Sequence, residues 1–128
     1  MDDLRSPLAK SKGLGASQDA SNEFWVQRLT ALALVPMVIW FCFSIALLPE
    51  ISYGVLRTWF QSPFNSIMMV LIVLVSFQHA HMGMQVIFED YISSYGPRVA
   101  AILLVKFLSY FLMAVGVFSI LKIALGSQ

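Results

Sequence analysis

The chain carries little charge. Asp, Glu, Lys and Arg make up 12% of its 128 residues, about half of their share in a soluble domain, and the mean hydropathy is +0.78. This composition excludes an ordinary soluble domain and predicts an integral membrane protein. With a net charge of +1 and no cluster of Lys and Arg, the sequence also excludes a nucleic-acid-binding face, which needs several cations aligned on phosphates.

Cysteine is almost absent, because Cys42 is the single one in the chain. Neither an internal disulfide nor a cysteine-based metal site can therefore form. The N-terminus lacks the apolar stretch of a signal peptide, since residues 1–24 are polar and rich in Gly, Ser and Ala. We expect an uncleaved polar arm at residues 1–24 on the cytoplasmic side, too poor in apolar residues to fold alone, followed by a membrane domain at residues 25–128.

Long uncharged runs dominate the rest of the sequence. Residues 29–48 and 64–88 contain no charged residue, and a third apolar run covers residues 99–125, with Lys106 and Lys122 near its ends. About 20 helical residues, at a rise of 1.5 Å each, span a hydrocarbon core of about 30 Å. The sequence therefore predicts an all-α integral membrane fold of three transmembrane helices. Their predicted bounds are about 25–48, 63–90 and 97–125.

Proline and glycine punctuate these runs. Pro36 lies inside the first run, where we expect a bend rather than a break. Residues 49–62 mix turn formers, charges and aromatics, which predicts an exposed loop with room for a short interfacial helix. Gly96-Pro97 is predicted to stop the second helix and reverse the chain.

The distribution of basic residues predicts the orientation. With the N-terminus inside, six Lys and Arg lie on the inner side and two on the outer side, which favours a cytoplasmic N-terminus in a cell inner membrane. Three helices expose too much surface to form a transport path alone, so we expect them to pack into a helical bundle with a partner subunit or with further copies of the same chain. The inner residues are Arg5, Lys10, Lys12, Arg28, Arg98 and Lys106, and the outer ones are Arg57 and Lys122.

Two histidines lie inside the second apolar run. An ionisable group at bilayer depth is costly and persists mainly where a partner, a metal or a water path compensates it. At about 100° per residue, His79 shares one helical stripe with Gly83, Val86 and Asp90, whereas His81 lies about 200° away. His79 is also about 16 Å from Asp90 along the helix, which predicts a position near the bilayer midplane.

A neutral imidazole at that depth is a suitable axial ligand for haem iron, with the second ligand supplied by another subunit. Gly83, one turn onward, leaves room for a flat macrocycle or another helix to approach closely. From the residues alone, His79 can equally be a hydrogen-bonded packing residue and Gly83 a helix contact. His81 is better explained by packing or by a place at the lipid interface.

Arg28 opens the first apolar run at the cytoplasmic interface. It can serve as an orientation anchor. It can also clamp an anionic group such as a haem propionate, because a guanidinium pairs bidentately with carboxylates. The two roles are compatible.

The second run also contains a family pattern. His79-Ala80, Gly83-Met84 and Asp90-Tyr91 resemble the second-helix signature of the succinate dehydrogenase hydrophobic membrane anchor subunit, the D chain of respiratory complex II. The N-terminal segments 5–8, 13–15 and 25–31 are similar to the alphaproteobacterial and mitochondrial-like branch of that family.

The resemblance implies a subunit that is not catalytic alone, within a complex that oxidises succinate, reduces ubiquinone and links the tricarboxylic acid cycle to the respiratory chain. Its implied partners are a flavoprotein, an iron-sulfur subunit and a second, cytochrome b556-type anchor that shares haem b. It further implies that His79 is an axial haem ligand and that Tyr91 donates a hydrogen bond to a quinone carbonyl. Asp90 would orient that site or assist proton delivery, and Arg28 would lie near the haem propionates and the quinone pocket.

Two other functions compete with this interpretation. The first is a cofactor-free structural anchor or assembly subunit, for which replacing His79 would change neither a spectrum nor quinone activity. The second is a small transporter or proton-channel subunit with His79 and Asp90 in a relay, which would conduct protons without succinate or quinone.

Overall fold

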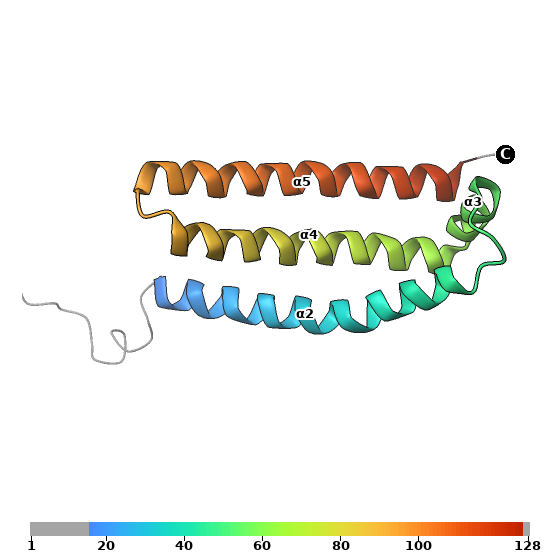
Figure 1. Cartoon of the computed structure of the whole chain (residues 1–128), viewed down its shortest axis with the longest axis horizontal. Coiled ribbons are helices and arrows are strands. Elements are labelled where there is room, and N and C mark those ends of the chain that lie inside the picture. The colour runs from blue at the N-terminus through green and yellow to red at the C-terminus, as the bar shows by residue number, and fades with distance from the viewer. Residues whose placement is uncertain (1–15, 127–128) are drawn as a thin grey trace, which may run out of the picture.

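Three long helices lie side by side and a short fourth helix covers one end of them (Figure 1). The computed structural model describes residues 16–126, and no strand occurs in that part of the chain. The central helix, α4, packs against both α2 and α5, whereas within residues 16–126 no Cα atom of α2 comes within 8 Å of one in α5. The predicted all-α architecture is confirmed. The helices are α2 (Ala16–Ala46), α3 (Tyr53–Gln61), α4 (Pro63–Tyr91) and α5 (Tyr95–Leu125).

Three of the helices are long and apolar enough to cross a membrane, namely Ser21–Ala46 within α2, α4 and α5. Their apolar side chains point mostly outward, and Met82 and Ile120 are the buried hydrophobic residues of the described chain. An apolar exterior is the arrangement that a helix needs when lipid or another subunit surrounds it. The three predicted spans are confirmed by length and composition.

The first helix is longer than the sequence indicates. It begins at Ala16 rather than near residue 25, and it ends at Ala46. Residues 16–24 contain no Gly or Pro, and adding residues to an existing helix costs much less than nucleating one. The helix of the first span therefore continues into the predicted polar arm. The remainder of that arm, residues 1–15, lies outside the described residues.

The prolines of α2 and α5 act differently. Pro36 lies inside α2 and the helix continues through it. Figure 1 shows that α2 is bent along its length rather than broken. Gly96-Pro97 does not form the turn predicted there, because both residues belong to the first turn of α5 and the chain reverses at residues 92–94. Proline is compatible with a first helical turn, where its missing N–H needs no partner.

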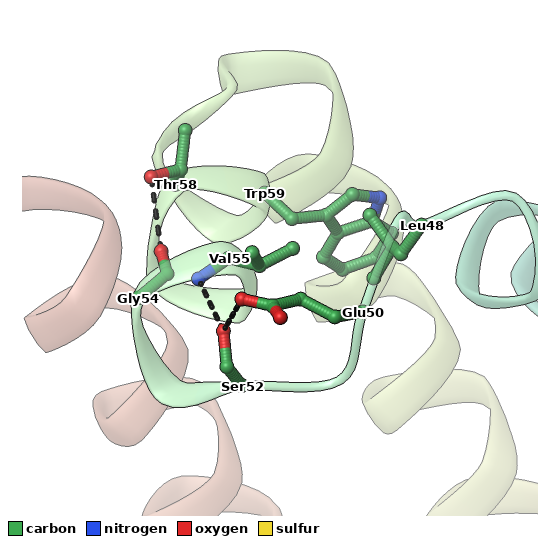
Figure 2. A pocket seen from close by; sticks show the side chains of 7 residues that line it. All are labelled: Leu48, Glu50, Ser52, Gly54, Val55, Thr58 and Trp59. Carbon is green, nitrogen blue, oxygen red and sulfur yellow. Dashed lines mark hydrogen bonds between the residues drawn. The ribbon is translucent and has the colours of Figure 1, made fainter.

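The short helix α3 has a defined start. Figure 2 shows the Ser52 hydroxyl between Glu50 and the first turn of α3: it donates to Glu50 Oε1 at 3.0 Å and accepts from the Val55 N–H at 3.4 Å. This bond satisfies one of the free N–H groups of the helix N-terminus. The residues around it line a pocket of about 470 Å³, at the opposite end of the bundle from the C-terminus of α4 (Figure 1).

Aromatic rings join three helices at that same end. Trp40 of α2 lies 5.7 Å from Trp59 of α3 and 5.8 Å from Phe64 of α4, centroid to centroid. Aromatic pairs at such distances contribute about 0.5–1.5 kcal/mol beyond their buried area, and Trp is enriched at the membrane–water interface. The cluster joins α2, α3 and α4 at the α3 end of the bundle, away from the end at which α4 finishes.

The interface between α4 and α5 is close-packed around Gly116. A Cβ added at Gly116 of α5 would lie 3.1 Å from Val73 Cγ1 of α4, so the absence of a side chain there lets the helices approach. Ser66, His81 and Ser109 are buried on the same two helices. Small residues at helix contacts are typical of membrane bundles, where packing rather than burial from water holds helices together.

Candidate functional site

His79 lies on the side of α4 that faces α2. Its Nδ1 is 3.0 Å from the hydroxyl of Thr30, which is 49 residues earlier in the chain. The same hydroxyl lies 2.7 Å from the carbonyl oxygen of Val26 and 3.1 Å from that of Gln27, both on α2. The His79 side chain is partly exposed, so one ring nitrogen is engaged with α2 while the ring stays accessible from outside the chain.

The stripe predicted on α4 follows α2. A Cβ added at Gly83 would meet Gln27 Nε2 at 3.9 Å, an ordinary contact, and Val86 lines a pocket of about 250 Å³ with residues of both helices. Gln27 Oε1 is buried and has no hydrogen-bond partner within the described chain. A buried polar atom without a partner is unfavourable by about 1–3 kcal/mol. The pocket is lined by Glu23, Phe24, Gln27, Met82, Gln85 and Val86.

His81 lies on the opposite side of α4. It is 6% exposed, its Nδ1 is 3.1 Å from the carbonyl oxygen of Phe77, and its ring packs 5.7 Å from the ring of Tyr110 on α5. Because a carbonyl oxygen only accepts, Nδ1 donates this bond. The structure thus separates the two histidines as the helical spacing predicts, and it places His81 in the packing between α4 and α5.

Asp90 and Tyr91 end α4. Both side chains are exposed, Tyr91 at 83%. Within residues 16–126, no hydrogen bond or ion pair holds the Asp90 carboxylate or the Tyr91 hydroxyl, whereas the preceding Glu89 accepts a bond from Gln85 Nε2 at 3.1 Å. The pair lies at the same end of the bundle as the start of α2 and of α5 (Figure 1). These two groups are presented to whatever adjoins that end.

Arg28 is not brought to His79 by this chain. It is exposed, and its guanidinium lies over the ring of Phe24, 5.1 Å from the centroid. Arg28 precedes Thr30 by two residues, so the two side chains leave α2 about 200° apart. A group clamped by Arg28 would therefore approach α2 from a different side than the one that faces His79.

The α2 side of α4 offers a single imidazole, that of His79, rather than a complete metal cage. No group of three or more His, Cys, Asp and Glu side chains comes together among the described residues. A bare ion needs several protein ligands, whereas haem iron takes four nitrogens from its porphyrin and needs only axial ligands from protein. His79 fits the second requirement and not the first.

Comparison with known proteins identifies the family. The model of the succinate dehydrogenase/fumarate reductase transmembrane subunit matches residues 2–121. The chain belongs to this family. A succinate dehydrogenase hydrophobic membrane anchor subunit of Rickettsia bellii (strain RML369-C) is 32% identical over 107 residues, which cover 84% of this chain and 86% of the relative.

Two further relatives agree with this assignment. The succinate dehydrogenase hydrophobic membrane anchor subunit of Paracoccus denitrificans is 25% identical over 122 residues, covering 95% of this chain and 94% of the relative. The succinate dehydrogenase membrane anchor subunit of Reclinomonas americana is 26% identical over 100 residues, covering 76% and 83%. The resemblance seen in the sequence to this transmembrane family is confirmed, and the chain is a multi-pass membrane anchor subunit.

Two residues of the site were not predicted. Thr30 and Gln27 lie in the segment that carries the family resemblance, but their side chains contact α4 only because α2 packs beside it. A hydroxyl residue in an otherwise apolar run is the signal that could have identified Thr30, since membrane helices use such residues for bonds between helices.

Proposed function

We propose that this family member is a membrane anchor subunit of a succinate:ubiquinone oxidoreductase, respiratory complex II. In this proposal it docks a flavoprotein and an iron-sulfur subunit, and it shares haem b with a second anchor of the cytochrome b556 type. It lies in the cell inner membrane with its N-terminus in the cytoplasm. The names of its relatives support the assignment to succinate dehydrogenase.

The position of His79 is the observation that carries the haem part of the proposal. Its ring is partly exposed at the middle of a long apolar helix, and of its two nitrogens only Nδ1 has a partner within residues 16–126. A charge or polar group at that depth needs compensation, and ligation of haem iron by the other nitrogen would supply it. When bound, haem b supplies a one-electron redox centre within the membrane. Gly83 would allow close approach beside it. Arg28 leaves α2 on a different side from Thr30, so it would contribute to the quinone pocket rather than hold the propionates of this haem.

The quinone part of the proposal uses the end of α4. Reduction of ubiquinone consumes two electrons and two protons, so its carbonyl oxygens need hydrogen-bond donors near water. Tyr91 would donate its phenolic hydrogen to one carbonyl oxygen, and Asp90 would orient the site or hold a proton for delivery. Both side chains are exposed at the same helix end and lack partners within the described chain.

A reduced-minus-oxidised visible spectrum of the complex, purified from membranes through a tag on this chain, tests the proposal. We expect a sharp b-type α-band together with succinate-dependent reduction of ubiquinone. A complex that oxidises succinate and reduces ubiquinone without that band would instead be a cofactor-free anchor with a quinone site. Proton flux through the chain alone, without succinate or quinone, would favour the relay function.

A further inference from the structure

Thr30 has more hydrogen-bond contacts than its single proton can serve. Its Oγ1 lies 2.7 Å from the Val26 carbonyl oxygen, 3.1 Å from the Gln27 carbonyl oxygen and 3.0 Å from His79 Nδ1. Carbonyl oxygens only accept, so the Thr30 hydroxyl proton is directed to the backbone of α2. The lone pairs of Oγ1 then face His79. The bond between the two side chains is therefore donated by the imidazole.

This direction of donation determines the tautomer of His79. A neutral imidazole holds one proton, and a proton on Nδ1 leaves Nε2 with a free lone pair. If Thr30 donated to Nδ1 instead, its oxygen would face the Val26 carbonyl oxygen at 2.7 Å with no proton between them, which is unfavourable. The arrangement thus presents Nε2 as the nitrogen that is able to bind a metal.

We infer that Thr30 is a positioning residue: its hydroxyl accepts the Nδ1 proton of His79, fixes the orientation of the ring and leaves Nε2 as the axial ligand of haem iron. The inference rests on the proposed function, because it concerns the same histidine. Histidine ligands are commonly oriented by an acceptor at their second nitrogen, which also raises their basicity. In a dry membrane interior such a bond is stronger than it would be in water.

The location of Thr30 gives the bond a second consequence. Thr30 belongs to α2 and His79 to α4, so the ligand is held by a neighbouring helix rather than by its own. His81 provides the contrast, because its Nδ1 donates to Phe77 of the same helix. The orientation of His79 therefore depends on how α2 packs against α4. A change in that packing would move Thr30 and so alter the orientation of the His79 ring toward the haem.

Thr30→Val tests this role in the whole complex, because valine keeps the shape of threonine and removes the acceptor. Thr30→Ser is the matched control, since it keeps the hydroxyl. We expect haem in the Thr30→Val complex to transfer to an excess of haem-scavenging apoprotein about tenfold faster or more. We also expect its midpoint potential to become more positive, because a less basic imidazole stabilises ferric iron less. Thr30→Ser should restore both values.

Two results would overturn the inference, and they are distinguishable. If His79→Ala loses the α-band while Thr30→Val keeps the parent potential and transfer rate, the histidine is the ligand and Thr30 does not position it. If His79→Ala keeps the band, the haem part of the proposed function fails and the inference fails with it. Thr30→Ala, which also lacks the acceptor, decides the question if Thr30→Val does not co-purify with the other subunits.

Discussion

The two sides of α4 use the same residue type in different ways. Toward α5, His81 is buried, donates to a carbonyl of its own helix and packs on Tyr110. Toward α2, His79 is partly exposed and bonds to Thr30 of another helix. The two histidines are two positions apart, so their side chains leave α4 about 200° from each other.

The comparison distinguishes an interface at which the histidine has a hydrogen-bond partner within α4 from one at which a buried polar atom has no partner in the described chain. On the α5 side, His81 has a partner and Gly116 brings the helices to close contact. On the α2 side, a buried Gln27 oxygen has no partner in the described chain. Pockets of similar size, about 250 and 240 Å³, lie on the α2 and α5 sides, but the one on the α2 side is lined in part by Glu23, Gln27 and Gln85, whereas Ser66 is the one polar residue lining the other. Buried polar groups are normally satisfied. The unpaired oxygen supports the proposal that a ligand or a partner subunit binds on the α2 side.

Replacement of the two histidines gives the largest expected difference between the two sides. His79→Ala should abolish the b-type α-band, because it removes the proposed axial ligand and no other described imidazole on that side can replace it. His81→Phe should keep the band, since phenylalanine preserves the packing against Tyr110. The measurement is the reduced-minus-oxidised spectrum of the purified complex, with the succinate-oxidising activity of each preparation as a check on assembly.

The cost of His81→Phe should be limited to stability. It removes one hydrogen bond, with a net contribution of about 0.5–1.5 kcal/mol, and the Phe77 carbonyl keeps its helical backbone bond. A spectrum that is lost in His81→Phe and kept in His79→Ala would reverse the assignment of the two sides.

Gly116→Leu tests how tightly α4 and α5 pack around Gly116. The Cβ of a side chain at position 116 would lie 3.1 Å from Val73 Cγ1. Overpacking of this kind lowers the free energy of unfolding by about 1–3 kcal/mol. Val115→Leu is the matched control, because Val115 is 45% exposed. We expect the thermal midpoint of the purified complex to fall for Gly116→Leu and not for Val115→Leu. Equal thermal midpoints for the two variants would mean that α4 and α5 can shift to accommodate a leucine at position 116.

Much of this arrangement was predictable from the sequence. Residues 29–48, 64–88 and 99–125 are nearly free of charge, so bilayer thickness alone fixes three spans. The 3.6-residue period separates His79 from His81 without any structure. It also aligns His79 with Gly83 and Val86, which the structure places along α2.

What the sequence could not predict depends on contacts between helices. The period gives the angle between two residues of one helix, but it does not say which neighbour lies on each side. Thr30 and Gln27 became site residues only once α2 was placed beside α4. The prediction of a chain reversal at Gly96-Pro97 was also wrong, because the same pair is compatible with a turn and with the first turn of a helix.

Tyr91→Phe examines the exposed end of α4, where we expect a smaller and more selective effect. The loss of one hydrogen bond to a quinone carbonyl removes about 0.5–1.5 kcal/mol, which slows ubiquinone reduction up to about tenfold. The haem spectrum should not change, because Tyr91 lies about 18 Å along the helix from His79. Tyr95→Phe is a suitable control, since Tyr95 is similarly exposed at 74%. Equal turnover by both variants would remove the proposed role of Tyr91.

Gly83→Ala should have the smallest effect, and it compares the two sides of α4 with one methyl group. At Gly83 the added carbon meets only Gln27 Nε2 at 3.9 Å, whereas at Gly116 it meets Val73 at 3.1 Å. Alanine is favoured over glycine inside a helix by about 1 kcal/mol, so the contacts within this chain predict a thermal midpoint of the complex that is unchanged or slightly higher, unless haem or a partner helix approaches Gly83 as proposed. Gly116→Ala should not raise it as much. If Gly83→Ala instead released the partner anchor or the haem, the close neighbour at Gly83 would be supplied from outside this chain, because nothing in the described residues stands near enough to be displaced.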